Sequence, residues 1–146
     1  MKAFTFSLKS VLEQKGWLEV EATRRLAVEV KRLQNVKEAI VSLQEGQESL
    51  RGQRSKEIEF TAPLQLQYVI YHQKLSLDLE QANLKLRKHK GLVSKRQLEL
   101  QKAVMEVKKL DKLKEREKES FKEEKKQKEM DVMNEISTNF FSRHSR

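Results

Sequence analysis

The sequence contains no cysteine and little proline, glycine or aromatic residue, and each shortage excludes something. Without cysteine there is no disulfide and no thiolate chemistry. One proline and four glycines in 146 residues leave few places where a helix must stop. No apolar run reaches about 18 residues, and Lys2, Ser7 and Lys9 interrupt the N-terminus. We therefore expect no membrane span, no signal peptide and a cytosolic location.

The abundant residues favour long helices. Charged residues make up 36% of the chain, and Lys, Leu, Glu and Gln are the commonest types. That mixture is typical of coiled coils, and one tryptophan and two tyrosines supply little aromatic mass for a compact core. The formal net charge of +9 suits a nucleic acid, an anionic lipid surface or an acidic protein, and charge alone does not choose among them.

Helix-breaking residues gather in one stretch, RGQRSKEIEFTAPL, which holds the only proline, Pro63. Pro63 suits the first turn of a helix, and Thr61 or a neighbour can cap that helix. The predicted organisation is a single coiled-coil domain, 1–146, with a helix over about 7–52, a connection over about 53–62 and a helix over about 63–140.

The start of the first helix can be read in two ways. With Ser7 as N-cap, Phe6 and Val11 have the spacing of a hydrophobic staple. With Ser10 as N-cap, Glu13 has the spacing of a capping box.

Seam residues recur at alternating spacings of three and four over both predicted helices, as in a coiled coil. The first helix supplies Leu8, Leu12, Ala22, Leu26, Leu33, Val36, Ile40, Leu43 and Leu50, with Lys15, Glu19, Glu29 and Gln47 as polar breaks. The second supplies Tyr68, His72, Leu75, Leu79, Ala82, Leu86, His89, Val93, Arg96, Leu100, Ala103, Val107, Leu110, Lys114, Glu117 and Phe121. We predict an all-α fold, a long antiparallel two-helix coiled-coil hairpin whose second helix overhangs the first by roughly 30 to 40 residues.

A pivot near residue 57 determines which residues face each other. It places Phe4, Phe6 and Leu8 opposite Val104, Val107 and Leu110. We therefore interpret the N-terminal aromatic residues as a clasp that closes the seam at the base of the overhang.

A second apolar stripe follows the second helix on another face. Its members recur every seven residues: Ile70, Leu77, Leu84, Leu98 and Met105, with Gly91 as a gap. One helix cannot cover both stripes, so this one packs on a third element or is a docking surface. Tyr68 and Tyr71, close to its start, are candidate binding anchors.

No enzyme motif is present: the sequence lacks a Gly-rich phosphate loop, an HExxH and a nucleophile elbow. His72, His89 and His144 are far apart in sequence and lack the other ligands of a metal site, and two of them fall on seam positions. We expect no enzymatic activity, no catalytic residue, no cofactor and no metal.

The segment KLRKHKGLVSKR contains six Lys or Arg and no acid. Together with basic residues of the first helix it forms a predicted basic belt: Arg24, Arg25, Lys31, Arg32, Lys85, Arg87, Lys88, Lys90, Lys95 and Arg96. The belt is a solvated face or a contact for an acidic partner. Nucleic-acid binding is a third reading, although no aromatic residue interleaves for base stacking.

The tail from Lys108 to Ile136 mixes Lys and Glu densely, and their i,i+4 pairs support a lone helix. A sparse apolar line follows it, formed by Phe121, Met130, Met133 and Ile136. The tail is either a charged helix that frays or a probe that inserts into a partner.

Two terminal motifs suggest a family. The N-terminal FxFxLxxVL consists of Phe4, Phe6, Leu8, Val11 and Leu12. The C-terminal LxxLKExxxxxFKEExxxKExxxxxE consists of Leu110, Leu113, Lys114, Glu115, Phe121, Lys122, Glu123, Glu124, Lys128, Glu129 and Glu135. With the two-helix layout, essentially the whole chain resembles the bacterial flagellar export protein FliJ.

The resemblance implies a non-enzymatic, cytoplasmic stalk similar to the central stalk of rotary ATPases. Such a stalk inserts in the hexameric flagellar type III export ATPase, promotes its assembly, contacts the membrane export gate and escorts empty export chaperones. It implies a monomer that binds no nucleic acid and reaches the cytoplasmic face of the inner membrane only through its partners, serving flagellum biogenesis, motility and chemotaxis.

The resemblance also implies two sets of partner-binding residues. Those for the gate lie near the hairpin tip: Val36, Ile40, Leu43, Gln47, Tyr68, Tyr71, His72, Leu75 and Leu79. Those for the ATPase lie at the base and overhang: Phe4, Phe6, Leu110, Leu113 and Phe121. Three alternatives stay open: the related stalk of a virulence type III secretion system, a basic coiled coil that binds nucleic acid, and an unrelated structural coiled-coil dimer.

Overall fold

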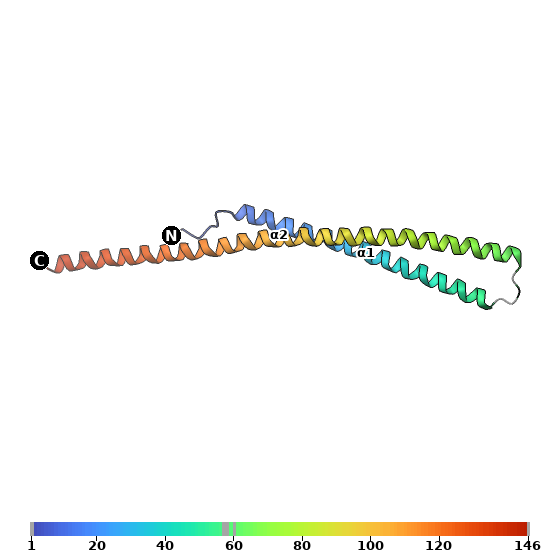
Figure 1. The fold of residues 1–146 in the computed structure, drawn as a ribbon. Coiled ribbons are helices and arrows are strands. Elements are labelled where there is room, and N and C mark those ends of the chain that lie inside the picture. The colour runs from blue at the N-terminus through green and yellow to red at the C-terminus, as the bar shows by residue number, and fades with distance from the viewer. Residues whose placement is uncertain (1, 57–58, 60, 146) are drawn as a thin grey trace. The chain divides into compact units, whose positions relative to one another are not determined.

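A computed structural model describes residues 2–56, 59 and 61–145, and two long α-helices account for most of them. Helix α1 spans Lys9–Lys56 and helix α2 spans Ala62–His144 (Figure 1). The described part of the chain contains no β-strand. The predicted all-α fold, two long helices packed against each other, is confirmed. The predicted pivot, residue 57, lies outside the described residues.

Both helices begin one or two residues from the predicted positions. The carbonyl of Thr61 accepts a hydrogen bond from the amide of Gln65 at 3.0 Å, so Thr61 occupies the N-cap position and Pro63 lies in the first turn. At α1 the carbonyl of Leu8 accepts the first such bond, from Leu12 at 2.9 Å. Ser7 is therefore not the N-cap, and Ser10 already lies inside the helix.

Contacts divide the chain into two compact units. Unit 1 consists of Met1–Glu19 and Lys102–Arg146, and unit 2 consists of Val20–Gln101. Unit 1 contains the start of α1 and the C-terminal part of α2, and unit 2 contains the rest of α1 and the first part of α2. The single domain over 1–146 stays a prediction.

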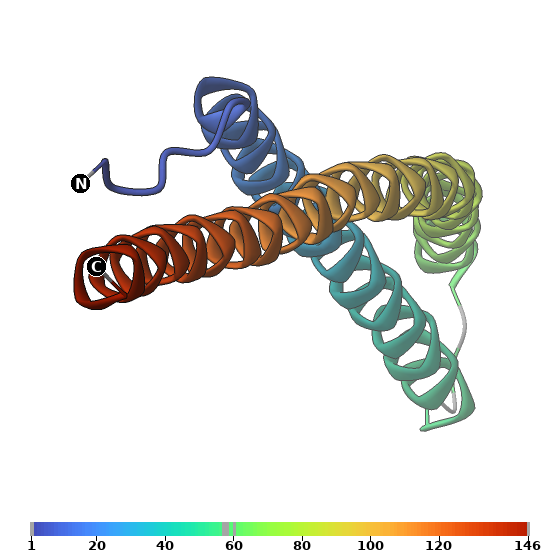
Figure 2. The ribbon, with the colours of Figure 1, turned by 90° about the vertical axis from the view of Figure 1, so that its left-hand side faces the viewer.

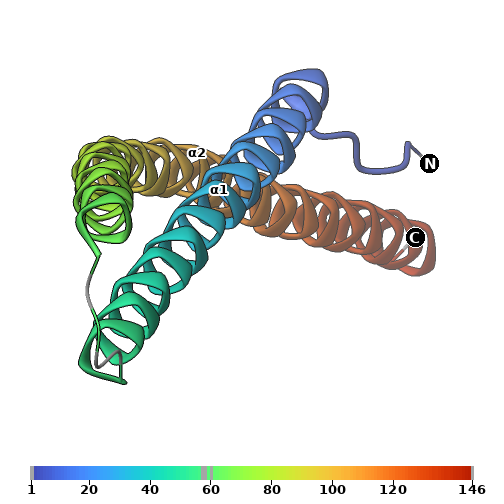
Figure 3. The same ribbon diagram turned by 90° about the vertical axis from the view of Figure 1, so that its right-hand side faces the viewer.

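The seam of unit 2 follows the predicted heptads. Ile40, Leu50, Leu75 and Ala82 are its buried apolar residues, and the remaining predicted seam positions of this unit are half-buried, except Glu29, which is buried. The helices run antiparallel, since Gly46 faces Leu75 and Glu29 faces His89; Figure 3 looks at the end where they are joined. A Cβ on Gly46 would lie only 3.7 Å from the Leu75 side chain, so the backbone of α1 approaches α2 closely there.

The register of unit 2 differs from the prediction. A pivot at 57 pairs Glu29 with residue 85, because the two numbers then sum to 114. The structure instead brings Glu29 to His89, with a sum of 118. The reason is that α1 continues to Lys56, so the midpoint between Lys56 and Ala62 falls at position 59.

In unit 1, the residues before α1 form a non-helical N-terminal strap, residues 2–8, against α2 (Figure 2). Phe6 is buried, and the rings of Phe4 and Phe121 lie 5.7 Å apart between centroids. The Ser7 hydroxyl donates a hydrogen bond of 2.8 Å to Glu117 Oε1. The N-terminal aromatic residues therefore do form a clasp on α2.

The predicted partners of this clasp are wrong. Phe4 meets Phe121 and Ser7 meets Glu117, further along α2 than Val104 to Leu110. Non-helical chain advances by up to about 3.3 Å per residue, against about 1.5 Å in a helix, so a few strap residues reach past many residues of α2. Lys114, a predicted seam residue, is exposed.

Beyond Phe121 the helix is uncovered: every residue from 122 to 145 is exposed. The overhang is confirmed: α2 continues 27 positions past Glu117, which meets Ser7 just before α1, and 23 positions past Phe121, which meets the strap. Over the described ranges, neither helix is long and apolar enough to cross a membrane.

Candidate partner-binding surfaces

Only some of the predicted tip residues lie on an accessible surface. In unit 2, a shallow pocket is lined mainly by Leu50, Arg54, Leu64, Tyr68 and Tyr71. The Arg54 guanidinium lies 4.8 Å above the Tyr68 ring, a cation–π contact that fixes this tyrosine. Tyr71 is 51% exposed. A rigid aromatic pocket of this kind suits one anchor side chain of a protein partner.

The other predicted tip residues hold the seam. Ile40 and Leu75 are buried, and Val36, Leu43, Gln47, His72 and Leu79 are half-buried between the helices. His72 also stacks on Tyr68, with ring centroids 6.1 Å apart. The structure thus brings Tyr68 and Tyr71 together at the pocket and places the rest where the paired helices cover them.

The predicted residues at the base mostly hold the strap. Phe6 is buried, Phe4 and Phe121 pack on each other, and Leu110 is half-buried. Leu113 is the most accessible of the five, at 36% exposed. Most of these residues therefore pack within unit 1, and little of their surface is left for a partner.

A larger surface continues from the strap along the uncovered part of α2. Lys2 and Phe121 line one end of an open groove of about 860 Å³, and Val132 and Met133 line the other. Further exposed apolar residues follow to the end of the helix: Met130, Ile136, Phe140 and Phe141. Phe140 and Phe141 were missed by sequence reasoning, although Phe140, seven residues after Met133 and four after Ile136, continues their helix face.

The end of α2 is locally ordered around these aromatic rings. Phe140 stacks on His144, with centroids 4.2 Å apart, and meets Phe141 edge-on at 6.5 Å. Hydroxyls of Ser142 and Ser145 donate to the terminal carbonyls of Asn139 and Phe141. The last turn of α2 is therefore capped, and it carries Phe140, which is 59% exposed, and Phe141, which is 71% exposed.

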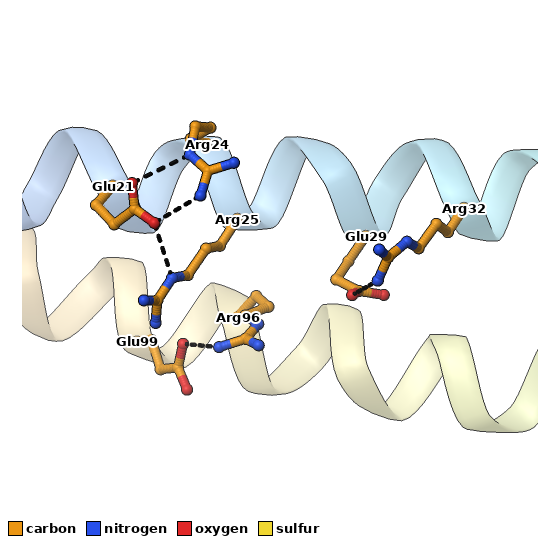
Figure 4. Close-up of polar contacts among 7 residues, drawn as sticks. All are labelled: Glu21, Arg24, Arg25, Glu29, Arg32, Arg96 and Glu99. Atoms are coloured by element: carbon orange, nitrogen blue, oxygen red, sulfur yellow. Dashed lines mark hydrogen bonds and ion pairs between the residues drawn. The ribbon is translucent and has the colours of Figure 1, made fainter.

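The basic belt is partly neutralised within unit 2 (Figure 4). Arg24 and Arg25 both bond Glu21, at 2.7 and 3.1 Å, and Arg96 bonds Glu99 at 2.8 Å. The hydrogen bond from Arg24, then that from Arg25, lowers the pKa of the Glu21 carboxyl to about 2. The hydrogen bond from Arg96 likewise lowers the pKa of Glu99.

The seam contains one buried carboxylate, which the sequence marked only as a polar break. Glu29 is 5% exposed, and its Oε1 accepts a hydrogen bond of 2.8 Å from Arg32 Nη1 on the same helix. Its Oε2 lies 3.4 Å from His89 Nδ1 on α2. A polar contact at one seam position favours one register over its neighbours.

The second apolar stripe is exposed as predicted. Ile70, Leu77, Leu84 and Leu98 in unit 2 and Met105 in unit 1 are each 56–60% exposed. The seam therefore uses one face of α2 and leaves this one uncovered.

A heptad seam between two long helices defines a coiled-coil protein. Among the described residues, no His, Asp and Glu cluster could hold a metal. The chain belongs to the flagellar FliJ protein family, whose model matches residues 4–146. It is therefore a component of flagellar protein export, and the family is a non-catalytic one. Comparisons with curated proteins and with solved structures found no match.

Proposed function

We propose that this chain is the non-enzymatic stalk of the flagellar export apparatus. It inserts the uncovered part of α2 into the hexameric export ATPase, promotes assembly of that ring, and links it to the membrane export gate. Family membership supports the flagellar role over that of a virulence system. The stalk binds export chaperones and works at the cytoplasmic face of the inner membrane, where its partners hold it.

One observation carries the ATPase end of this proposal. From Lys122 to Ser145 every residue is exposed, yet this stretch contains Met133, Ile136 and Phe140 at i, i+3 and i+7. Such spacing is that of a helix that lays one apolar face into a groove of its partner. Contiguous exposed apolar residues such as Phe140, which is 59% exposed, mark interaction surfaces, and a helix that only frayed in water would not need them.

The gate end is supported by the tip pocket. Tyr71 is exposed beside Tyr68, whose ring Arg54 already fixes, so binding there costs little side-chain ordering. The buried tip residues Ile40 and Leu75 contribute by holding the two helices together.

The test is equilibrium binding of full-length variants to two separate probes, the export ATPase and the cytosolic domain of the gate protein. The variant Met133→Ser, Ile136→Ser, Phe140→Ser should bind the ATPase at least about tenfold more weakly and the gate normally. Tyr71→Ala should show the opposite pattern.

A matched control removes the same kind of surface elsewhere. Val30→Ser with Val41→Ser changes two exposed apolar residues of α1 and should bind both probes normally. If the tail variant binds the ATPase as the control does, the ATPase end is misplaced.

A further inference from the structure

The outer face of α2 in unit 2 combines positive charge with an apolar line. Residues 81–98 contain six Lys or Arg and no Asp or Glu. Within them, Leu84 and Leu98 are 58% and 60% exposed, one on each side of Gly91. Arg87, Lys88 and Lys95 are also exposed.

These residues share one face because of helix geometry. At about 100° per residue, Leu84, Lys88, Gly91, Lys95 and Leu98 fall within one narrow sector of α2. The seam residues Leu86 and Val93 fall on the opposite side, against α1. We call the outward sector the Gly91 face.

Gly91 makes a dent in this face. A Cβ built at Gly91 meets nothing within 4 Å, so the backbone there is open to the outside. Leu84 and Leu98 stand one heptad before and after it. Lys88, Gly91, Leu92 and Lys95 have the i, i+3, i+4 and i+7 spacing of a hole that accepts one knob from a second helix.

Two carboxylates flank the face, Glu80 before it and Glu99 after it, and both lie outside residues 81–98. Glu99 accepts a hydrogen bond of 2.8 Å from Arg96, and this bond lowers its pKa more than the nearby charge of Lys95 does. Arg96 lies on the seam side and contributes nothing to the face, whereas Arg87, Lys88 and Lys95 are outside every ion pair recorded between the described residues. The complement is therefore an acidic surface.

We propose that the Gly91 face binds an acidic amphipathic helix of a protein partner, with an apolar knob over Gly91 and carboxylates beside Lys88 and Lys95. A nucleic acid fits less well, because no aromatic residue on this face can stack on bases. An anionic membrane fits less well, because the exposed apolar residues of this stripe stand seven or more positions apart and form too narrow a strip for insertion. The proposal is independent of the stalk function.

The probe is a fluorescein-labelled 21-residue helical peptide with leucine at every seventh position, glutamate on both flanks and alanine elsewhere. A scrambled peptide of the same composition is its control. Fluorescence anisotropy with the intact protein at physiological ionic strength should show binding of the first peptide and at least about tenfold weaker binding of the scrambled one.

Two variants locate the site. Lys88→Glu with Lys95→Glu should weaken the peptide about tenfold or more, whereas Lys31→Glu with Lys37→Glu, which makes the same charge change on exposed residues of α1, should not. Gly91→Leu should also weaken the peptide, because it fills the hole. Circular dichroism should show unchanged helix content in all three variants.

Vesicles of phosphatidylcholine with phosphatidylglycerol, and a 20-base-pair DNA duplex, serve as competing probes. Equal effects of the two charge pairs, or equal binding of both peptides, would overturn the proposal. Vesicle binding that Gly91→Leu strengthens would assign the face to a membrane instead. DNA binding that depends on Lys88 and Lys95, without peptide binding, would assign it to a nucleic acid.

Discussion

The apolar seam residues of the paired helices in unit 2 are covered, whereas the apolar residues at the uncovered end of α2 in unit 1 are exposed. In unit 2, Ile40, Leu50 and Leu75 are buried against the facing helix. Beyond Phe121, Met133, Ile136 and Phe140 have no facing helix and are 59–67% exposed. The first segment buries its apolar seam residues within the chain, and the second leaves its apolar residues exposed. Under the proposed function, folding and binding are assigned to different stretches of one helix.

The largest expected effect lies in the seam. Leu75→Ala should lower the free energy of unfolding by about 2–3 kcal/mol, because it opens a cavity beside Gly46. Leu77→Ala, on the same helix but 60% exposed, should change it by no more than about 0.5 kcal/mol. Urea denaturation followed by circular dichroism measures both. Equal losses would erase the distinction between the seam and the outer stripe.

The strap should have the next largest effect. Phe4→Ala with Phe6→Ala should lower the melting temperature by about 5 °C, because the buried Phe6 and the Phe4–Phe121 contact are lost. Phe140→Ala with Phe141→Ala removes two exposed rings and should melt like the parent protein. If the strap variant also melts like the parent, the strap serves docking alone.

A double-mutant cycle on Glu29 and His89 sharpens the account of the seam. We expect a coupling of about 0.5–1 kcal/mol between Glu29→Ala and His89→Ala, since the carboxylate is buried and lies 3.4 Å from the ring nitrogen. The free energy of unfolding of four proteins gives this value. Strict additivity would show that the contact does not help to choose the register.

The smallest expected effect is a pH dependence of unit 2. The pKa of Glu21 is lowered from 4.5 to about 2 in the folded protein, so the unfolded chain takes up protons first as the pH falls. The contribution of Glu21 is therefore complete above about pH 4.5 and is lost on acidification towards pH 2. Thermal melting between these values should decline less in Glu21→Gln than in the parent. If the melting temperatures of both proteins decline equally, Glu21 does not contribute to the pH dependence.

Sequence periodicity predicted the seam well, because a two-helix coil has one repeated contact geometry. Leu26, Val36 and Val93 are covered where the heptads place them. The strap register was not predictable in the same way, since Phe4 and Ser7 precede α1 and do not follow helical spacing.

The candidate sites were less predictable than the fold. Their place in the sequence puts Ile40 and Leu75 near the tip, but their heptad positions bury them in the seam. Tyr71 lies off the seam and is exposed for that reason. Phe140 continues the face of Met133 and Ile136, so its spacing was a signal for it in the sequence, whereas Phe141 lies about 100° further round the helix.

The central claim is that the uncovered end of α2 is the part that a partner covers. Hydrogen–deuterium exchange of the intact chain, with and without the export ATPase, tests it most directly. The account predicts new protection between residues 122 and 145 and little change in the seam of unit 2. Protection confined to unit 2, with residues 122–145 exchanging as in the free protein, would contradict it.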